Sequence, residues 1–375
     1  MPISNCNKGV WSLDQAYKKI NKNVWDIATS GELWVIGDNG AGRLGINCGV
    51  VSTARSSPVQ IPGLIWCSID IENNGGVIAL QSDGTLWGWG CNNFGALGQN
   101  NVTHRASPVQ IPGTTWNSAI TGGTFTLATR NDGTLWAWGE NSIGQLGQNN
   151  VTHRSSPVQI PGTTWCQISG GGAFSIALKS DNTLWAWGNN CIGQLGQNNV
   201  TCVSSPIQIP GTSWCKVKAL NNFSLALKSD NTLWAWGCNL AGQIGDNTTA
   251  SKSSPVQIPG TQWCQISASN SNSAAIKTDN TLWTWGSGSR GQLGDNSSIA
   301  KSSPVQVPGS WKQIEISNSH MIGIKTDNTV WTWGDNQFGQ LGQSDVVTRS
   351  SPVQIPGTTW KLVNAGSGNT ALIKF

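Results

Sequence analysis

Basic side chains recur at one position of a repeated segment, immediately before Ser-Ser-Pro or Ala-Ser-Pro. His104 and His153 precede two of them, and the six basic residues are Arg55, Arg105, Arg154, Lys252, Lys301 and Arg349. A ring of six positive charges could grip an acidic protein or another polyanion. The alternative interpretation is that each residue is a solvated charge that discourages pairing between sheet edges. Both interpretations stay open, and all eight residues are candidate partner contacts.

The three histidines, His104, His153 and His320, are the residues to consider for acid–base catalysis. A catalytic site would need a nucleophile and an orienting acid that converge on one of them. His104 and His153 share one repeat position, and no acid–base pair distinguishes one copy of the repeat from the others. We therefore predict that the protein is not an enzyme and that these two histidines are solvated loop residues.

Asp residues at predicted hairpin turns and the ten Cys residues are the remaining groups with ligand chemistry. Each turn Asp stands alone, whereas a calcium loop needs several oxygens at short intervals. The Cys residues lack the Cys-x-x-Cys or Cys/His pairing of a zinc site. Equivalent positions in adjacent repeats should also lie too far apart for a disulfide. We predict no metal and no cofactor, a reducing compartment, and free, small buried thiols at Cys67, Cys166, Cys215 and Cys264.

The basic, His, Asp and Cys residues described above are positioned by secondary-structure elements that belong to a repeat of about 49 residues. Thr-Leu-Trp-Ala-Trp-Gly, or a near variant, recurs at intervals of 48 to 53 residues, with its first Trp at Trp34, Trp87, Trp136, Trp185, Trp234, Trp283 and Trp331. A second marker, Ser-Pro-Val-Gln-Ile-Pro-Gly, recurs in phase with the first, with its first Pro at Pro58, Pro108, Pro157, Pro206, Pro255, Pro304 and Pro352. One supersecondary unit has therefore been copied seven times.

A single unit, from Trp165 to Gly211, contains four short β-favouring segments. Residues 165–169 and 174–179 form the first two, Asp181-Asn182 supplies a turn, and residues 183–187 and 205–209 form the other two. Such units cannot bury both faces alone, so they predict an all-β fold: a seven-bladed β-propeller of four-stranded antiparallel blades. A parallel β-helix, the competing architecture, has shorter rungs and no such hairpins.

The two ends of the chain predict how the ring closes. The last unit stops at Phe375, before its second half, and the first unit begins at Gly31 with that missing half. We expect strands from both termini to share one blade of a propeller that spans residues 25–375. Residues 1–24 fall outside the pattern and are predicted to be an N-terminal arm or docking segment, with candidate contacts Trp11, Tyr17, Lys18 and Lys19.

The repeat also predicts which face of the propeller binds a partner. Turns between the second and third strands, and Pro-Gly links between units, are nearly invariant, whereas the first–second and third–fourth loops differ between units. Recognition usually lies on long loops held by a rigid scaffold, so we place any partner on the variable face. Of the 22 Trp residues, 20 occupy three repeat positions, which assigns them to the core between blades rather than to ligand stacking.

Composition narrows the class of partner and the location. Only 11% of residues are charged and the formal net charge is +4, which is too small to imply nucleic acid or an anionic membrane. The N-terminal residues lack the pattern of a secretory signal, and no segment has the length of a membrane span. We expect a protein partner, no membrane, and a location in the cytoplasm or in a virion.

The repeat resembles that of the regulator of chromosome condensation family. The resemblance rests on Leu-Trp-x-Trp-Gly, on Gly-Gln-Leu-Gly at 144–147, 193–196 and 291–294, and on Ser-Pro-Val-Gln-Ile, in that order and over most of the chain. It implies a seven-bladed propeller. The Asn-rich, weakly charged repeats look most similar to bacterial and bacteriophage members of that family.

Two kinds of function follow from this resemblance. The first is a non-enzymatic structural or protein-interaction propeller, such as a virion decoration or tail protein in a symmetric multi-copy assembly, or a secreted propeller-type inhibitor. The second is guanine-nucleotide exchange on a Ran-like small GTPase, which the resemblance associates with an inserted wedge. Because the regular spacing of the units leaves no room for such a wedge, we favour the first.

Overall fold

The computed structural model describes residues 31–37, 40–42, 44–47, 55–71, 76–316, 319–337, 341–343, 345–355, 360–366 and 369–374. Apart from one 3₁₀ turn, η2 (Gly40–Gly42), the regular elements of these residues are all β-strands. The candidate arm residues Trp11, Tyr17, Lys18 and Lys19 lie outside the described residues, so their role stays a prediction.

Most strands belong to four-stranded antiparallel sheets in which consecutive strands are neighbours. Five such blades are β6 (Trp116–Thr121), β7 (Phe125–Arg130), β8 (Leu135–Gly139) and β9 (Arg154–Ile160); β10 (Trp165–Gly170), β11 (Phe174–Lys179), β12 (Leu184–Gly188) and β13 (Val203–Gln208); β14 (Trp214–Leu220), β15 (Phe223–Lys228), β16 (Leu233–Gly237) and β17 (Lys252–Gln257); β18 (Trp263–Ala268), β19 (Asn272–Lys277), β20 (Leu282–Gly286) and β21 (Lys301–Val307); β22 (Trp311–Ile316), β23 (His320–Lys325), β24 (Val330–Gly334) and β25 (Arg349–Gln354).

The sixth sheet is longer because one strand serves two partners. It contains β1 (Gly31–Gly37), β2 (Arg55–Ile71), β3 (Gly76–Gln81), β4 (Leu86–Gly90) and β5 (Arg105–Ile111). The first half of β2 pairs with β1, and its second half, from Trp66, pairs with β3. The second half of β2 with β3–β5 thus repeats the pattern of the other blades.

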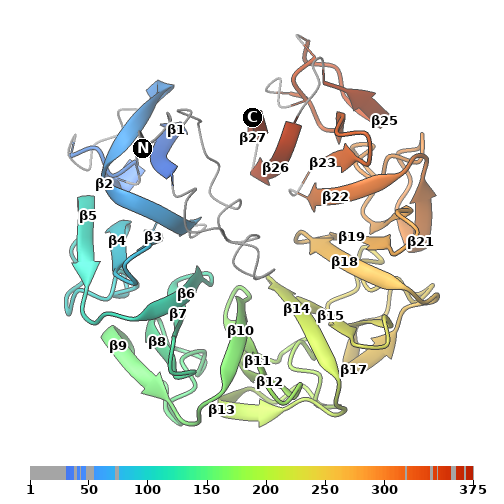
Figure 1. Ribbon diagram of the computed structural model, residues 1–375. Coiled ribbons are helices and arrows are strands. Elements are labelled where there is room, and N and C mark those ends of the chain that lie inside the picture. The colour runs from blue at the N-terminus through green and yellow to red at the C-terminus, as the bar shows by residue number, and fades with distance from the viewer. Residues whose placement is uncertain are drawn as a thin grey trace, which may run out of the picture.

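The sheets stand around a common centre, with β6, β10, β14, β18 and β22 nearest to it and β5, β9, β13, β17, β21 and β25 at the rim (Figure 1). This arrangement confirms an all-β fold built from four-stranded antiparallel blades. A separate hairpin, β26 (Trp360–Gly366) and β27 (Asn369–Lys374), follows the last complete blade. The pairing of β27 with β1, and with it the seventh blade and the closure of the ring, stays a prediction.

The hairpin turns form as their sequence predicts. In the β11–β12 turn Asn182 adopts a left-handed φ of 64°, and Gly133 adopts 77° at the equivalent position. The carboxylate of Asp181 accepts hydrogen bonds from the N–H and the hydroxyl of Thr183, at 3.0 and 2.6 Å. These bonds, and more weakly the charge of Lys179, lower the pKa of Asp181. The turn Asp residues are therefore structural.

Tryptophans bind the blades to each other, as their spacing predicts. Trp187 is fully buried, lies edge-on to Trp165 with ring centroids 6.1 Å apart, and donates its indole N–H to the carbonyl of Gln145 in the preceding blade, at 2.9 Å. Lys179 lies over the rings of Trp165 and Trp185, 4.6 and 4.4 Å from their centroids. Each cation over a pair of rings adds attraction to apolar burial.

The Gly-Gln-Leu-Gly motif brings each loop onto the next blade. Gly144 has a φ of 84°, and a Cβ atom there would lie 2.6 Å from the Cα of Ser204 at the rim of the following blade. The N–H of Asn149 then donates to the carbonyl of Ser204 at 2.7 Å. The motif is therefore an interblade joint that requires glycine.

Candidate protein-interaction face

The first–second and third–fourth loops of the blades lie on one face, which we call the long-loop face. Its third–fourth loops are residues 91–104, 140–153, 189–202, 238–251, 287–300 and 335–348. The two kinds of loop touch: the N–H of Glu140 donates to the carbonyl of Thr124, and that of Asn189 to the carbonyl of Ala173, at 3.0 and 2.9 Å. The hairpin turns and the links between blades lie on the opposite face, the hairpin face.

A buried asparagine organises most of the third–fourth loops, a role that the sequence analysis missed; Gly288 replaces it in the loop at 287–300. Asn141 is fully buried. Its side-chain N–H₂ donates to the carbonyls of Asn150 and Thr152, at 2.9 and 3.1 Å, and its side-chain oxygen accepts from the N–H of Leu146 at 2.9 Å. Asn92, Asn190 and Asn239 make equivalent contacts. The Asn that recurs two residues after Trp-Gly was the available signal.

The two candidate histidines help to hold this loop. Nδ1 of His153 accepts a hydrogen bond from the backbone N–H of Asn141 at 2.8 Å, and Nδ1 of His104 accepts one from Asn92 at 3.0 Å. Both histidines lie in loops as predicted, but only His153 is exposed, whereas His104 is half-buried. The ring of Phe94 lies edge-on to His153 at 5.4 Å and links the loops of two blades.

All six basic candidates occupy one structural position, the first residue of a rim strand. Arg105 pairs with Gly90, Arg154 with Gly139, and the others likewise with the Gly that ends the preceding strand: Arg55 with Gly37, Lys252 with Gly237, Lys301 with Gly286 and Arg349 with Gly334. The fold therefore distributes them around the edge of the long-loop face. Their role in binding stays a prediction.

Three of these basic residues are neutralised within their own loops. Lys252 pairs with Asp246 at 2.9 Å, Lys301 with Asp295 at 3.5 Å, and Arg349 with Asp345 at 2.6 Å. Burial opposes ionisation of Asp246, yet hydrogen bonds from Thr248 and Lys252 lower the pKa of its carboxyl. The carboxylate is therefore charged at neutral pH, and the pair carries no net charge.

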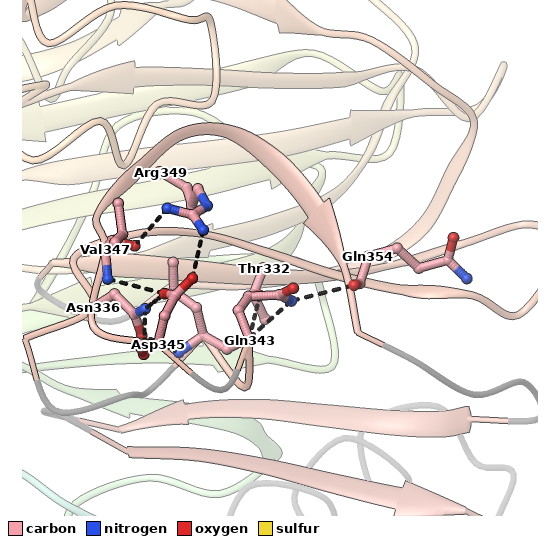
Figure 2. A network of polar contacts seen from close by, with 8 residues as sticks. Thr332, Asn336, Gln343, Asp345, Val347, Arg349 and Gln354 are labelled. Atoms are coloured by element: carbon pink, nitrogen blue, oxygen red, sulfur yellow. Dashed lines mark hydrogen bonds and ion pairs between the residues drawn. The ribbon is translucent and has the colours of Figure 1, made fainter.

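Figure 2 shows that the guanidinium of Arg349 contacts residues of its own loop. Its guanidinium donates to Asp345 and to the carbonyl of Val347, at 2.6 and 3.3 Å, while Asn336 holds the backbone carbonyl of Asp345 at 2.9 Å. Gln343, in the same loop, donates from its side chain to the carbonyl of Gln354 at 3.2 Å. Arg349 therefore stabilises the conformation of its own loop.

Arg105 and Arg154 differ from these three. Within the part of the chain that the structure describes, neither has an ion pair, and the Nε atom of each is buried without a hydrogen-bond partner. In their loops the position of Asp246 is taken by Gln99 and Gln148. The side chain of Gln148 instead donates to the carbonyl of Gln159 at 3.1 Å. These two blades therefore keep an uncompensated positive charge.

Exposed apolar side chains share these loops. Val102, Val151 and Val200 stand at one repeat position in three consecutive blades, 58%, 59% and 59% exposed. Leu240 is 81% exposed in the next third–fourth loop. Apolar groups that recur on one face, beside charged groups, are typical of a surface that contacts protein.

One cavity lies on the hairpin face, between the first two complete blades. Its wall includes Cys67, Gln81, Asp83, Thr115 and Asn131. Burial, and then the charge of Asp83, raises the pKa of the Cys67 thiol to about 11. The thiol is therefore protonated at neutral pH and is a poor nucleophile.

The cysteines depart from the sequence prediction in two respects. Cys67 and Cys264 are only half-buried, and Cys166 and Cys215 are exposed, because this position faces away from the packed side of the strand; the prediction of buried thiols was wrong. The eight described cysteines form no disulfide with one another. However, the thiols of Cys191 and Cys202, in one third–fourth loop, lie 3.9 Å apart, a proximity that the sequence analysis missed.

We expect oxidised glutathione to join Cys191 to Cys202. One thiolate attacks the glutathione disulfide, and the second thiolate displaces glutathione from the mixed disulfide, so that two thiols are lost. The hydrogen bond with Cys202 raises the pKa of Cys191, so the reaction should accelerate as the pH rises. Peptide mass spectrometry under non-reducing conditions detects the bond, and Cys202→Ser is the control. A linkage between other cysteines, formed first, would contradict the prediction.

Among the described residues, no helix is long and apolar enough to cross a membrane.

Comparison with known proteins gives both a family and a set of similar folds. The model of the "Regulator of chromosome condensation (RCC1) repeat" matches six consecutive segments, residues 83–129, 132–178, 181–227, 230–276, 279–324 and 327–373. A second model of the same repeat matches residues 165–194, 215–243, 263–292 and 311–340. No curated protein matches the sequence.

Three solved structures resemble the fold at low sequence identity. Human WBSCR16 is 19% identical with a TM-score of 0.75, and the match covers 92% of this chain and 98% of that one. Prp20p from Saccharomyces cerevisiae is 17% identical with a TM-score of 0.77, covering 99% and 97%. Yeast RCC1 (Prp20) bound to Kap60 is 18% identical with a TM-score of 0.74, covering 100% and 95%. These similarities support the propeller architecture.

Proposed function

Because the chain belongs to the regulator of chromosome condensation (RCC1) repeat family, we propose that it is a non-enzymatic β-propeller that binds protein partners through its long-loop face. The observation that carries the proposal is the contrast between the two faces. Uniform turns occupy the hairpin face, whereas the long-loop face combines individual loops, exposed valines and two unpaired arginines. Rigid blades hold these loops in place, as recognition surfaces require.

Proteins with similar folds support the choice of a protein as partner. The yeast protein RCC1 (Prp20) forms a complex with Kap60, and Prp20p is described by its binding to Gsp1p and histones. We place the partner of this chain in the same broad class, protein, and leave its identity to experiment. The low charged fraction, 11% of residues, favours it over nucleic acid.

The absence of enzymatic activity is part of the proposal. It is supported by the protonated Cys67 thiol in the hairpin-face cavity and by the loop role of His104 and His153, whose Nδ1 atoms accept backbone hydrogen bonds. The alternative function is guanine-nucleotide exchange on a Ran-like small GTPase. It predicts faster release of labelled GDP in the presence of the protein, whereas our proposal predicts an unchanged rate.

We also propose a setting for this interaction. The Asn-rich repeats with few charges suit a decoration or tail-associated protein of a bacteriophage-type virion, in a symmetric multi-copy assembly, or a protein of the cytoplasm. A secreted propeller-type inhibitor is the alternative. Copies of the chain in purified particles would support the first of these, and their absence would remove it.

Photo-cross-linking tests the choice of face directly. A photoreactive amino acid replaces Val151, 59% exposed on the long-loop face, or Asp181, exposed on the hairpin face. In an extract of the source organism, we expect a cross-linked partner protein from position 151 and none from position 181. The reverse pattern would overturn the proposed function.

A further inference from the structure

The long-loop face is divided into two sectors of different charge. We propose that the sector formed by the loops at 91–104, 140–153 and 189–202, the open sector, binds an acidic, partly apolar protein segment. The proposal rests on the proposed function and names the chemistry of its partner. Its candidate contacts are Arg105, Arg154 and the three exposed valines, whereas the opposite sector, with Lys252, Lys301 and Arg349, supports its own loops.

Aspartates in the loops create this division: Asp246 and Asp295 stand at one repeat position, and Asp345 stands two residues after Gln343, which takes that position in its own loop. Where the loop contains Asp246 or Asp295, the following basic residue is held in an ion pair. Where it contains Gln99 or Gln148, the amide turns to the backbone of the rim strand, at 3.0 Å from the carbonyl of Gln110 for Gln99. The loops at 91–104 and 140–153 contain no aspartate, so the charge of the neighbouring arginine stays available. Arg105 and Arg154, on adjacent blades, are the two charges released in this way.

Carboxylates are the groups that these arginines should prefer. A guanidinium presents several N–H donors in a planar fork that matches a carboxylate, and the contact strengthens when water is excluded. Both side chains are half-buried, and the buried Nε of each has no partner within the described structure. Part of the desolvation that binding requires has therefore already occurred on folding.

The valines favour an acidic protein over an acidic nucleic acid. Val102, Val151 and Val200 offer the partner an aliphatic row that is more than half exposed. Recognition of single-stranded nucleic acid relies instead on aromatic platforms and a denser positive charge. The aromatic ring of Phe94 in this sector already contacts His153. Glu140, the acidic residue of these loops, is held by the hydroxyls of Thr124 and Ser142, so it does not pair with the arginines.

A fluorescence anisotropy titration tests the proposal with a labelled peptide of repeating Glu and Leu residues. The double variant Arg105→Gln/Arg154→Gln should weaken binding by roughly tenfold or more, which two exposed ion pairs can supply. The matched variant Lys252→Gln/Lys301→Gln removes the same net charge from the other sector, and it should change the affinity by less than about twofold. Thermal unfolding of each variant shows that the propeller is intact.

A second variant should bind the peptide more tightly than the native chain does. Asp246→Gln copies the residue of the open sector and frees Lys252, so it should strengthen binding of the peptide by a fewfold. Equal losses from the two double variants would mean that binding follows net charge alone and would overturn the proposal. No binding of the peptide by the native chain, or tighter binding of single-stranded DNA, would also overturn it. In each of these cases a cross-link from position 151 still upholds the proposed function.

Discussion

Replacing Trp187 by Ala should lower the free energy of unfolding by about 3–5 kcal/mol, the usual cost of deleting a buried aromatic side chain. Trp187 is fully buried, packs against Trp165, and ties its blade to the preceding one through the carbonyl of Gln145. The change removes packing within a blade and a hydrogen bond between blades together. Urea unfolding followed by circular dichroism measures the loss.

Trp187→Phe separates these two contributions. Phe keeps an aromatic ring in the core but has no indole N–H, while the carbonyl of Gln145 still accepts from the hydroxyl of Ser175 at 2.8 Å. We expect a smaller loss, about 1–2 kcal/mol. Equal losses from the two variants would contradict a packing role for the ring, and a negligible loss from Trp187→Ala would show that the blades hold together without it.

Gly144→Ala should destabilise the protein by about 2–5 kcal/mol, from two causes that add. A left-handed φ of 84° costs a non-glycine residue about 1–2 kcal/mol. A Cβ atom 2.6 Å from the backbone of Ser204 forces the loop and the next blade apart, which costs a further 1–3 kcal/mol or so. Thermal unfolding gives the difference in stability, and proteolysis of the 140–153 loop reports on the opened joint.

Gly162→Ala is the matched control for the second cause. Gly162 has a similar φ of 98°, but a Cβ atom there would come no closer than 3.6 Å to any neighbour, the terminal nitrogen of Lys179 included. We expect this variant to lose only the backbone contribution, about 1–2 kcal/mol. If the two variants lose the same stability, the close approach of the Gly-Gln-Leu-Gly motif to the next blade contributes nothing.

The elements of a blade could be predicted from sequence because the signals are local. The β-favouring segment at 174–179 and the Asp181-Asn182 turn each predict a feature that the structure contains. Agreement between seven copies of the pattern reinforced each signal. The predicted role of the tryptophans followed from the same repetition, because residues at one position of every blade must contact the neighbouring blade.

What escaped prediction depends on contacts between positions that the pattern alone does not connect. The joint between Gly144 and Ser204 joins residues 60 positions apart, and the loop contacts of Asn141 require the folded loop. The division of the basic ring is of the same kind, since the five basic positions whose side chains are described differ in whether a nearby Asp reaches them. The sequence shows which positions carry a basic residue, whereas the folded loop decides whether that residue is already held in an ion pair or can bind a partner.

The cysteines show how a residue type can mislead. Cys166 and Cys215 follow a buried Trp at the start of the inner strand, and the sequence analysis predicted them to be small buried residues because cysteine usually is. Strand pairing is irregular between the first and third residues of these strands, and the second residue is exposed. The alternation of side chains along a strand, rather than the residue type, decided the exposure of these cysteines.

Hydrogen–deuterium exchange of the protein, alone and with the partner recovered from position 151, tests the central claim most directly. If recognition lies on the long-loop face, exchange should slow in the loops at 91–104, 140–153 and 189–202 and stay unchanged at the hairpin turns of the same blades, residues 82–84, 131–133 and 180–182. Protection of those turns, with exchange in the long loops unaltered, would contradict the account and move the binding site to the hairpin face.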